Sequence, residues 1–423
     1  MTGPTLPPIG SFRSQARREL PRFGSRLARV ACARKNHQVT SLAPYDTLLL
    51  LSFGGPEQPQ DVMPFLRNVT EGRGIPDERL AEVAEHYHHF GGRSPINDQN
   101  RALLAAVRAE LDARGHRLPL VWGNRNWAPY VTDVLREAHA AGSRRVLAVL
   151  TSAYSSYSSC RQYREDLAAA LLTLAGEGII LEVDKVRHYY NHPGFAAAST
   201  EAAVAALGSL PDGAHLVFVT HSVPDAMDEA AGPNGHAYTD QHRDLAAHIA
   251  AAAGRELGRP VPWQLVYCSR SGLPSQSWLE PDVRDHLRAL NADRAPGAAV
   301  VPIGFVSDHL EVAYDLDTEA KEVAAEIGLP FARAATVGTH PLFVSGLVDL
   351  LHERAATARG EHSEHPFVGV RGPSHSVCPT GCCRNLRAER PAACGVDWVT
   401  PKPGATSKPG ATSSISAEPS VAS

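Results

Sequence analysis

Short apolar runs alternate with longer amphipathic stretches through most of the 423-residue chain. The apolar runs are rich in Leu, Val and Ile, as in strands that are buried on both faces of a sheet. They lie at 47–53, 118–122, 145–150, 179–186, 215–220, 264–267 and 299–303. The stretches between them have the apolar spacing of helices, at 100–114, 130–141, 161–174, 195–207, 240–257 and 311–326.

This alternation predicts an α/β fold with parallel sheets that are flanked by helices. Strands that are separated by helices form βαβ units, and the helices then cover both faces of the sheet. The elements fall into two sets, which predict two Rossmann-like halves at 46–206 and 207–355. In such folds a ligand binds at the carboxyl ends of the strands, so we expect a site between the halves.

The two ends of the chain differ from this body. Residues 1–45 carry eight basic side chains and one acidic side chain, Glu19. An unstructured basic extension and a targeting segment both fit this pattern, and the apolar core of a secretory signal is missing. A Cys-rich segment is expected at 356–399. The tail at 400–423 repeats KPGATS and has no aromatic residue, so we predict that it is disordered.

Composition excludes several classes of protein. Hydrophobic residues make up 43% of the chain and charged residues 20%, which is typical of globular proteins. The net charge of −4 offers no electrostatic reason to expect a nucleic-acid partner. The longest apolar run, 47–53, is too short to cross a bilayer, so no integral membrane segment is expected. We expect a cytoplasmic protein, and its oligomeric state is not readable from the sequence.

Chemistry-bearing residues follow two of the predicted strands. No phosphate-binding G-x-x-x-x-G-K-[ST] occurs, and no G-x-G-x-x-G follows a strand, so nucleotide chemistry loses its usual support. His221 follows the strand at 215–220, where a neutral imidazole can bind a metal ion or accept a proton. Glu311, Asp315 and Glu319 are spaced four residues apart on a predicted helix, so they share one face. A solvated acidic face or a row of metal ligands would have this spacing.

Taken together, these segments resemble the ferrochelatases, which insert Fe²⁺ into a porphyrin in haem biosynthesis. The resemblance covers roughly residues 46–350, in the order and spacing of the family. The Cys-bearing C-terminus is similar to that of the actinobacterial type, whose substrate is coproporphyrin III. The matching pieces are LLLLSFGGPEQPQDVMPFL (48–66), HYHHFGGRSPIN (86–97), THSVP (220–224), SRSGLPSQSWLEPDV (269–283) and GFVSDHLEVAYDLDTEA (304–320).

The resemblance implies a chelatase-type fold and an enzyme whose substrates are Fe²⁺ and a porphyrin, with Fe-coproporphyrin III (coproheme) as product. It makes His221 the proton acceptor and a metal contact, and Glu311 the Fe²⁺ ligand. Asp315 and Glu319 would deliver the ion or carry protons. Insertion removes two pyrrole protons and strips water from Fe²⁺, which explains why a base and a carboxylate are both needed.

Four further residues are implied to bind the porphyrin. Ser94 and Tyr163 would hydrogen-bond its propionates, with Arg73 as a charged helper. Ser94 could instead, or also, cap a helix, and Tyr163 could simply be a packing aromatic. Phe53 stands where some relatives have a metal-reaching tyrosine, so its role is at most that of a wall against the ring.

The cysteines suggest a further group. Some ferrochelatases hold a [2Fe–2S] cluster with one internal and three C-terminal cysteines, and four thiolates are the usual ligands of such a cluster. Zinc and unligated thiols stay open as alternatives. Cys394 is the reserve ligand, and Cys268 is interpreted as a buried, unreactive thiol. The implied cluster ligands are Cys160, Cys378, Cys382 and Cys383.

Other functions remain in view. The porphyrin could be protoporphyrin IX instead of coproporphyrin III, or the chain could be a chelatase of the sirohydrochlorin type. A haem or metal carrier that binds without turnover is a candidate from another class. The acidic residues at 311–319 favour an enzyme, because a carrier has no need of an ion path beside a base.

Overall fold

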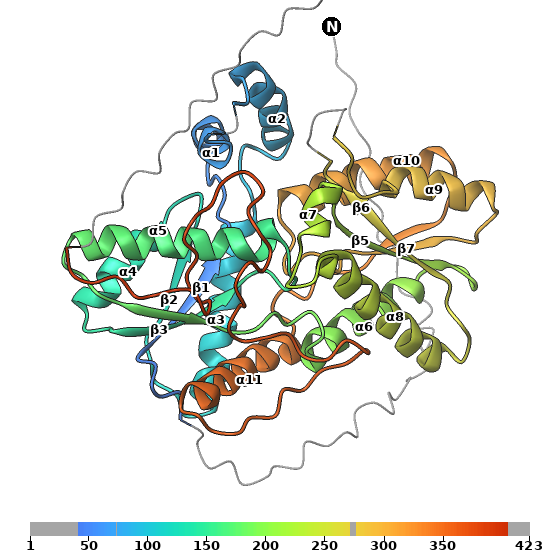
Figure 1. The fold of residues 1–423 in the computed structure, drawn as a ribbon. Helices are drawn as coiled ribbons and strands as arrows, with labels where there is room; N and C mark the ends of the chain where they lie inside the picture. Colours follow the sequence, from blue (N-terminus) through green and yellow to red (C-terminus); the bar gives the residue numbers. More distant parts are fainter. Residues whose placement is uncertain (1–40, 73, 271–275, 405–423) are drawn as a thin grey trace, which may run out of the picture. The chain divides into compact units, whose positions relative to one another are not determined.

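The computed structural model describes residues 41–72, 74–270 and 276–404 (Figure 1). The basic extension up to residue 40, Arg73 and the tail from residue 405 therefore lie outside the described residues.

Two four-stranded parallel sheets form the framework, and they confirm the predicted α/β class. The first sheet has the strand order β2-β1-β3-β4 and the second has the order β6-β5-β7-β8, so both halves repeat one topology. All seven predicted strands are present, and β8 was missed. The strands are β1 (Thr47–Ser52), β2 (Leu120–Asn124), β3 (Arg145–Leu150), β4 (Glu182–Lys185), β5 (His215–His221), β6 (Trp263–Cys268), β7 (Ala298–Val301) and β8 (Phe331–Arg333).

Helices connect the strands and cover the sheets. They are α1 (Val62–Val69), α2 (Asp77–His89), α3 (Ile96–Ala113), α4 (Val131–Ala140), α5 (Gln162–Gly176), α6 (Pro193–Leu207), α7 (Asp225–Glu229), α8 (Ala237–Leu257), α9 (Val283–Ala292), α10 (Lys321–Glu326) and α11 (Pro341–Ala358). A 3₁₀ turn, η2, spans Pro59–Asp61. Two wider π-helical segments, with i→i+5 hydrogen bonds, are η3 (Tyr157–Arg161) and η4 (Val312–Ala320).

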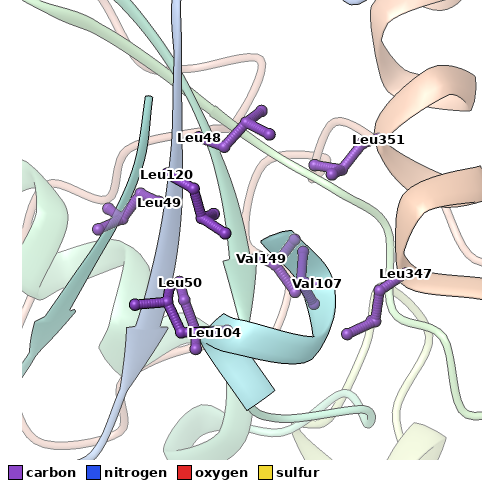
Figure 2. Close-up of a pocket in the computed structure, with 9 residues that line it drawn as sticks. All are labelled: Leu48, Leu49, Leu50, Leu104, Val107, Leu120, Val149, Leu347 and Leu351. Carbon is purple, nitrogen blue, oxygen red and sulfur yellow. The ribbon is translucent and has the colours of Figure 1, made fainter. Parts of the chain in front are cut away.

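Alternating side chains of β1 point to two different layers. Leu49 and Leu51 pack in a cluster with α4 and α5, while Leu48 and Leu50 belong to the core on the other face. This alternation is the two-residue period of a strand that is buried on both faces. A cavity of about 10 Å³ lies in this core and is lined by aliphatic side chains of β1, β2, β3, α3 and α11 (Figure 2). It is too small and too apolar for more than a single water, so it is a packing defect and not a ligand site.

Two helices link the halves into one core. α6 follows β4 but packs against α8 and β7 of the second sheet, and α11 returns to pack against α3 and α6. One hydrophobic cluster consequently contains Leu50 of the first sheet and Phe218 of the second. At the carboxyl ends of the strands, the Tyr154 hydroxyl after β3 donates to the carbonyl of Ile303 after β7 at 2.9 Å. The carboxyl ends of the two sheets are thus held close together.

The segment after α11 runs without helix or strand through residues 359–404. It crosses α5, where the red trace in Figure 1 passes over the green helix. The backbone N–H of Ala393 donates to the carbonyl of Arg164 on α5 at 2.9 Å, which fixes the crossing point. Among the helices of the described residues, none has an apolar stretch long enough to span a membrane.

Candidate active site

His221 is the last residue of the central strand β5, whose preceding residues are almost fully buried. Its ring Nδ1 donates to the carbonyl of Ser222, which leaves Nε2 unprotonated in the neutral ring and free to accept a proton or bind a metal. The Tyr238 hydroxyl on α8 donates to the His221 carbonyl at 2.8 Å. The strand end and the ring orientation are therefore both fixed by neighbouring groups.

Gly304 allows the chain after β7 to pass directly beside β5. A Cβ atom at this position would lie 2.1 Å from the Thr220 hydroxyl oxygen, so no other residue fits without moving the strand. The Gly304 N–H donates to the Val219 carbonyl at 3.1 Å. This close approach carries the following segment, with Glu311, to the side chain of His221.

Glu311 faces His221 at the start of η4. Its Oε1 lies 3.9 Å from His221 Nε2, and its Oε2 lies 4.0 Å from Nδ1 of His309. The side chains of His221 and Glu311 are 34% and 49% exposed, so both can reach a ligand. Burial lowers the pKa of His309, which therefore stays neutral beside the carboxylate.

Asp315 is the next carboxylate along η4. The Ser269 hydroxyl donates to its Oδ2. Burial, with smaller contributions from Glu311 and Glu319, raises the pKa of Asp315 to about 6. Asp315 therefore lies within electrostatic reach of both Glu311 and Glu319.

Glu319 is the last of the three carboxylates along η4 and has a cationic partner. Arg284 Nη1 of α9 donates to Glu319 Oε2 at 3.1 Å, and Arg284 Nε donates to Asp282 at 2.9 Å. Asp308 and Asp317, by contrast, both pair with Arg333. Those two carboxylates are occupied in an ion-pair network of their own.

Helix α2, which the sequence pattern did not reveal, packs beside the acidic row. The His86 ring stacks on the Tyr314 ring with centroids 3.9 Å apart. Burial and the nearby charge of Glu311 raise the pKa of Tyr87. The first half of the chain thus contributes aromatic side chains to the surroundings of the Glu311 carboxylate.

Phe53 and Ser94 lie at the carboxyl end of the first sheet. Phe53 follows β1 and packs edge-to-face against Phe65 of α1, with ring centroids 6.3 Å apart. Ser94 is 5% exposed and packs against Gly55. The N–H of Ile96 at the start of α3 reaches its hydroxyl at 3.4 Å, a weak capping contact.

Tyr163 is more deeply packed than the other predicted porphyrin contacts. It is 4% exposed and lies in the cluster beneath α5. The Arg125 guanidinium carbon lies 4.4 Å from the centre of its ring, a cation–π contact. The structure does not bring Phe53, Ser94 or Tyr163 into direct contact with His221. Arg73 lies outside the described residues.

The four cysteines that were predicted as cluster ligands form one buried group. Cys160 comes from η3, and the others come from the segment after α11. Cys382 Sγ lies 3.8 Å from Cys383 Sγ and 3.7 Å from His375 Nε2. The group consists of Cys160, Cys378, Cys382 and Cys383 and is called the four-cysteine group below.

The other two cysteines of the described residues, Cys394 and Cys268, lie outside this group. Cys394 donates to the Val183 carbonyl at 3.3 Å and packs in the cluster beneath α5. Cys268 pairs with His221 across β5 and β6, and burial raises its thiol pKa well above the usual value. Cys268 therefore stays a protonated thiol at neutral pH.

An imidazole nitrogen and a row of carboxylates stand where the carboxyl ends of two parallel sheets meet. Hard oxygen ligands beside a nitrogen base suit a divalent metal ion and proton transfer, so the fold and the site define a metal-handling α/β enzyme. A comparison with protein-family models matches the Ferrochelatase model to residues 45–355. The chain belongs to the ferrochelatase family, and is thus a metal chelatase with Fe²⁺ as a substrate.

Curated relatives match the sequence of this chain over nearly their own full length. "Coproporphyrin III ferrochelatase" of Streptomyces griseus is 57% identical over 365 residues, which cover 84% of this chain and 97% of that protein. The protein of the same name from Streptomyces coelicolor is 55% identical, covering 85% and 98%. "Ferrochelatase" of Rhodopirellula baltica is 47% identical, covering 84% and 98%. Among solved structures, SirB from Bacillus subtilis with Fe³⁺ is 11% identical, with a TM-score of 0.46, covering 74% of this chain and 97% of that one.

Proposed function

We propose that this enzyme inserts Fe²⁺ into coproporphyrin III and releases Fe-coproporphyrin III and two protons. The observation that carries the proposal is the facing pair of His221 Nε2 and Glu311 Oε1, 3.9 Å apart at the carboxyl ends of the sheets. The choice of porphyrin is supported by the names of the relatives that are 57% and 55% identical to this chain.

His221 is the proton acceptor in this proposal. Its Nδ1 is engaged by the Ser222 carbonyl, so Nε2 is the nitrogen that takes a pyrrole proton. Glu311 supplies an oxygen ligand for Fe²⁺ as the metal loses water, and its charge stabilises the histidine once it is protonated. The two residues thereby serve the two requirements of insertion, a base and a metal ligand.

Asp315 and Glu319 are proposed to deliver the ion. Asp315 is the middle carboxylate of the row, and Glu319 is the one farthest along η4 from Glu311. A row of three acidic side chains creates a negative potential that raises the local concentration of Fe²⁺. Arg284, bound to Glu319 at 3.1 Å, lies at the Glu319 end of this row.

The proposed porphyrin contacts are those that the resemblance of the sequence to the ferrochelatases implies. Phe53 is proposed as a wall against the ring, and Ser94 and Tyr163 as partners of propionates, with Arg73 as helper. Because Ser94 and Tyr163 are 5% and 4% exposed, a propionate can reach their hydroxyls only if neighbouring side chains move. Arg125, which lies over Tyr163, is the cation whose position such a movement would change.

The test is an anaerobic assay with coproporphyrin III and protoporphyrin IX side by side, with Fe²⁺ and the full chain. Porphyrin fluorescence is lost on metallation, and we expect faster loss with coproporphyrin III. Faster turnover of protoporphyrin IX would overturn the proposed substrate while leaving an iron chelatase. Tight binding of either porphyrin without metallation would favour the carrier function instead. We place the reaction in the cytoplasm.

A [2Fe–2S] cluster is proposed for the four-cysteine group. Four thiols, each at most 1% exposed, come from two segments more than 200 residues apart in sequence, which is the donor set that such clusters use. Cys394, bonded to the Val183 carbonyl, is not needed as the reserve ligand. A cluster bound there would supply electron-transfer capacity. Its neighbour His375 also permits a zinc site, so iron, sulfide and zinc content must be measured together.

A further inference from the structure

Two cationic side chains are completely buried beside the four-cysteine group. Arg164 on α5 is 0% exposed and Lys185 at the end of β4 is 1% exposed. A charge that is removed from water is costly unless a charge of opposite sign or several hydrogen bonds compensate it. The partners of these two side chains therefore need an explanation.

Arg164 is turned toward the Cys-bearing segment. Its Nε donates to the Ala393 carbonyl at 2.7 Å and its Nη2 to the Ala392 carbonyl at 3.4 Å, while Nη1 has no hydrogen-bond partner among the described residues. Its Nη2 lies so close to Gly395 that a Cβ there would be 2.2 Å away, and Gly395 forms a bridge with Cys378. The nearest carboxylate oxygen, on the partly exposed Asp397, is 3.9 Å away.

Lys185 lacks a carboxylate partner altogether within the described ranges. Its ammonium group donates to the Val186 carbonyl at 3.3 Å, and none of the described carboxylates forms a salt bridge with this ammonium group. The contrast with Arg187, two residues later, is informative. Arg187 is equally buried, and its Nε binds the Glu353 carboxylate at 2.8 Å. The fold thus supplies an acid for one buried cation and none for the other.

The four-cysteine group is a further source of negative charge for these cations. Burial alone would lower the pKa of Lys185, but Cys378 and Cys160 raise it, and the balance is a raised pKa. The same thiols act on Arg164 in the same direction. Both cations therefore lie within electrostatic reach of Cys160 and Cys378.

We infer that Arg164 and Lys185 are the counter-charges of the four-cysteine group in its cluster-bearing form. Their positive charges offset the net negative charge of the cluster and its thiolates in the protein interior. The inference rests on the proposed [2Fe–2S] cluster. An oxidised cluster core carries two positive charges and its four thiolates four negative ones, which leaves two negative charges for these two cations to offset. Reduction adds one more negative charge. The two side chains are positioning residues for the cluster and take no part in porphyrin metallation.

Lys185→Met in the full chain tests this directly. With one positive charge removed, the cluster is harder to reduce, so the ratio of reduced to oxidised cluster at a fixed potential falls at least ten-fold, or about 59 mV for one electron. A redox titration followed by electron paramagnetic resonance measures this ratio. Lys185→Arg keeps the charge and keeps the ratio within two-fold of wild type. Arg136→Met, which removes a surface cation paired with Glu177, controls for the change in total charge.

A second measurement separates charge from packing. In protein stripped of iron and sulfide, thiols of the group regain protons and Lys185 loses most of its counter-charge, so stripped Lys185→Met melts no lower than stripped wild type. Equal loss of melting temperature in loaded and stripped protein, or an unchanged reduction ratio, overturns the inference. If Lys185→Met loads no cluster, loading of Lys185→Arg supports the inference and failure of both contradicts it. If wild type binds no iron and sulfide, the cluster and this inference fall together, while metallation of coproporphyrin by the same sample tests the proposed chelatase separately.

Discussion

His221, the last residue of β5, and Glu311, at the start of η4, face each other, with Nε2 of the histidine 3.9 Å from Oε1 of the glutamate. The distance leaves the two groups without a direct hydrogen bond. The separation leaves room for one metal ion to bind both atoms, which is the geometry that the proposed insertion needs.

Glu311→Gln is expected to reduce kcat by about 100-fold or more, because an amide neither ligates Fe²⁺ well nor stabilises a protonated His221. Steady-state metallation of coproporphyrin III measures it. Glu322→Gln, on the exposed side of α10, is the matched control and should keep wild-type activity. Similar rates for the two variants would remove Glu311 from the site.

Arg284→Gln should lower the KM for Fe²⁺ several-fold with little change in kcat. The substitution removes the cation that binds Glu319 at 3.1 Å, so the acidic row attracts Fe²⁺ more strongly. Arg288→Gln on the same helix, whose partner is the exposed Asp285, is the control. The difference between the variants should shrink at high salt. A raised KM in Arg284→Gln would mean that the arginine positions Glu319 for iron binding.

Cys160→Ser should abolish cluster assembly, whereas Cys394→Ser should leave it intact. Cys160 belongs to the four-cysteine group, and Cys394 is bonded to the Val183 carbonyl outside it. Iron and sulfide analysis with a visible spectrum distinguishes the two variants. Loss of the cluster in Cys394→Ser but not in Cys160→Ser would reverse the assignment of the ligands. Zinc without sulfide in wild type would identify a zinc site.

His242 is expected to make stability depend on pH. Its ring stacks on the Tyr154 ring with centroids 3.5 Å apart, and its Nδ1 donates to the Tyr238 carbonyl at 2.7 Å. Burial lowers its pKa from 6.5 to about 3. The neutral ring is stable in the fold above pH 6.5. Below that pH, the unfolded chain binds a proton that the folded chain refuses, so stability falls as the pH falls.

The expected slope from His242 is about 1.4 kcal/mol per pH unit between pH 6 and 4. His242→Phe keeps the stack and cannot titrate, so its unfolding free energy should vary less with pH by that amount. Urea unfolding at pH 7.5, 5.5 and 4.5 measures the difference. Parallel curves for wild type and variant would show that His242 does not stay neutral in the folded protein.

Much of the framework could be predicted from local pattern. The strand 215–220 is apolar from Leu216 to Val219 and leads directly to His221, and parallel sheets place such strand ends together. The spacing of Glu311, Asp315 and Glu319 likewise predicted one row. Helix α11, by contrast, was missed, although Pro341 at its first position and the His340 side chain, which accepts from Leu342 N–H, are recognisable start signals.

Other features depend on contacts between distant segments, which no local pattern contains. The passage of Gly304 against Thr220, the Arg284 bridge to Glu319 and the hydroxyl of Ser269 on Asp315 all join separate elements. The π-helical hydrogen bonding of η4 was not predicted either, since its sequence has ordinary helical spacing. Helix α2 buries only Leu80 and Ala84, so its apolar pattern was too weak to detect.

The most direct test of the proposed function is single-turnover metallation of bound coproporphyrin III by anaerobic Fe²⁺, in wild type and in His221→Ala. Wild type should metallate the bound porphyrin and release two protons per iron. His221→Ala should bind the porphyrin with similar affinity but metallate it about 100-fold more slowly, because the proton acceptor is missing. Metallation by His221→Ala at the wild-type rate would contradict the proposed chemistry.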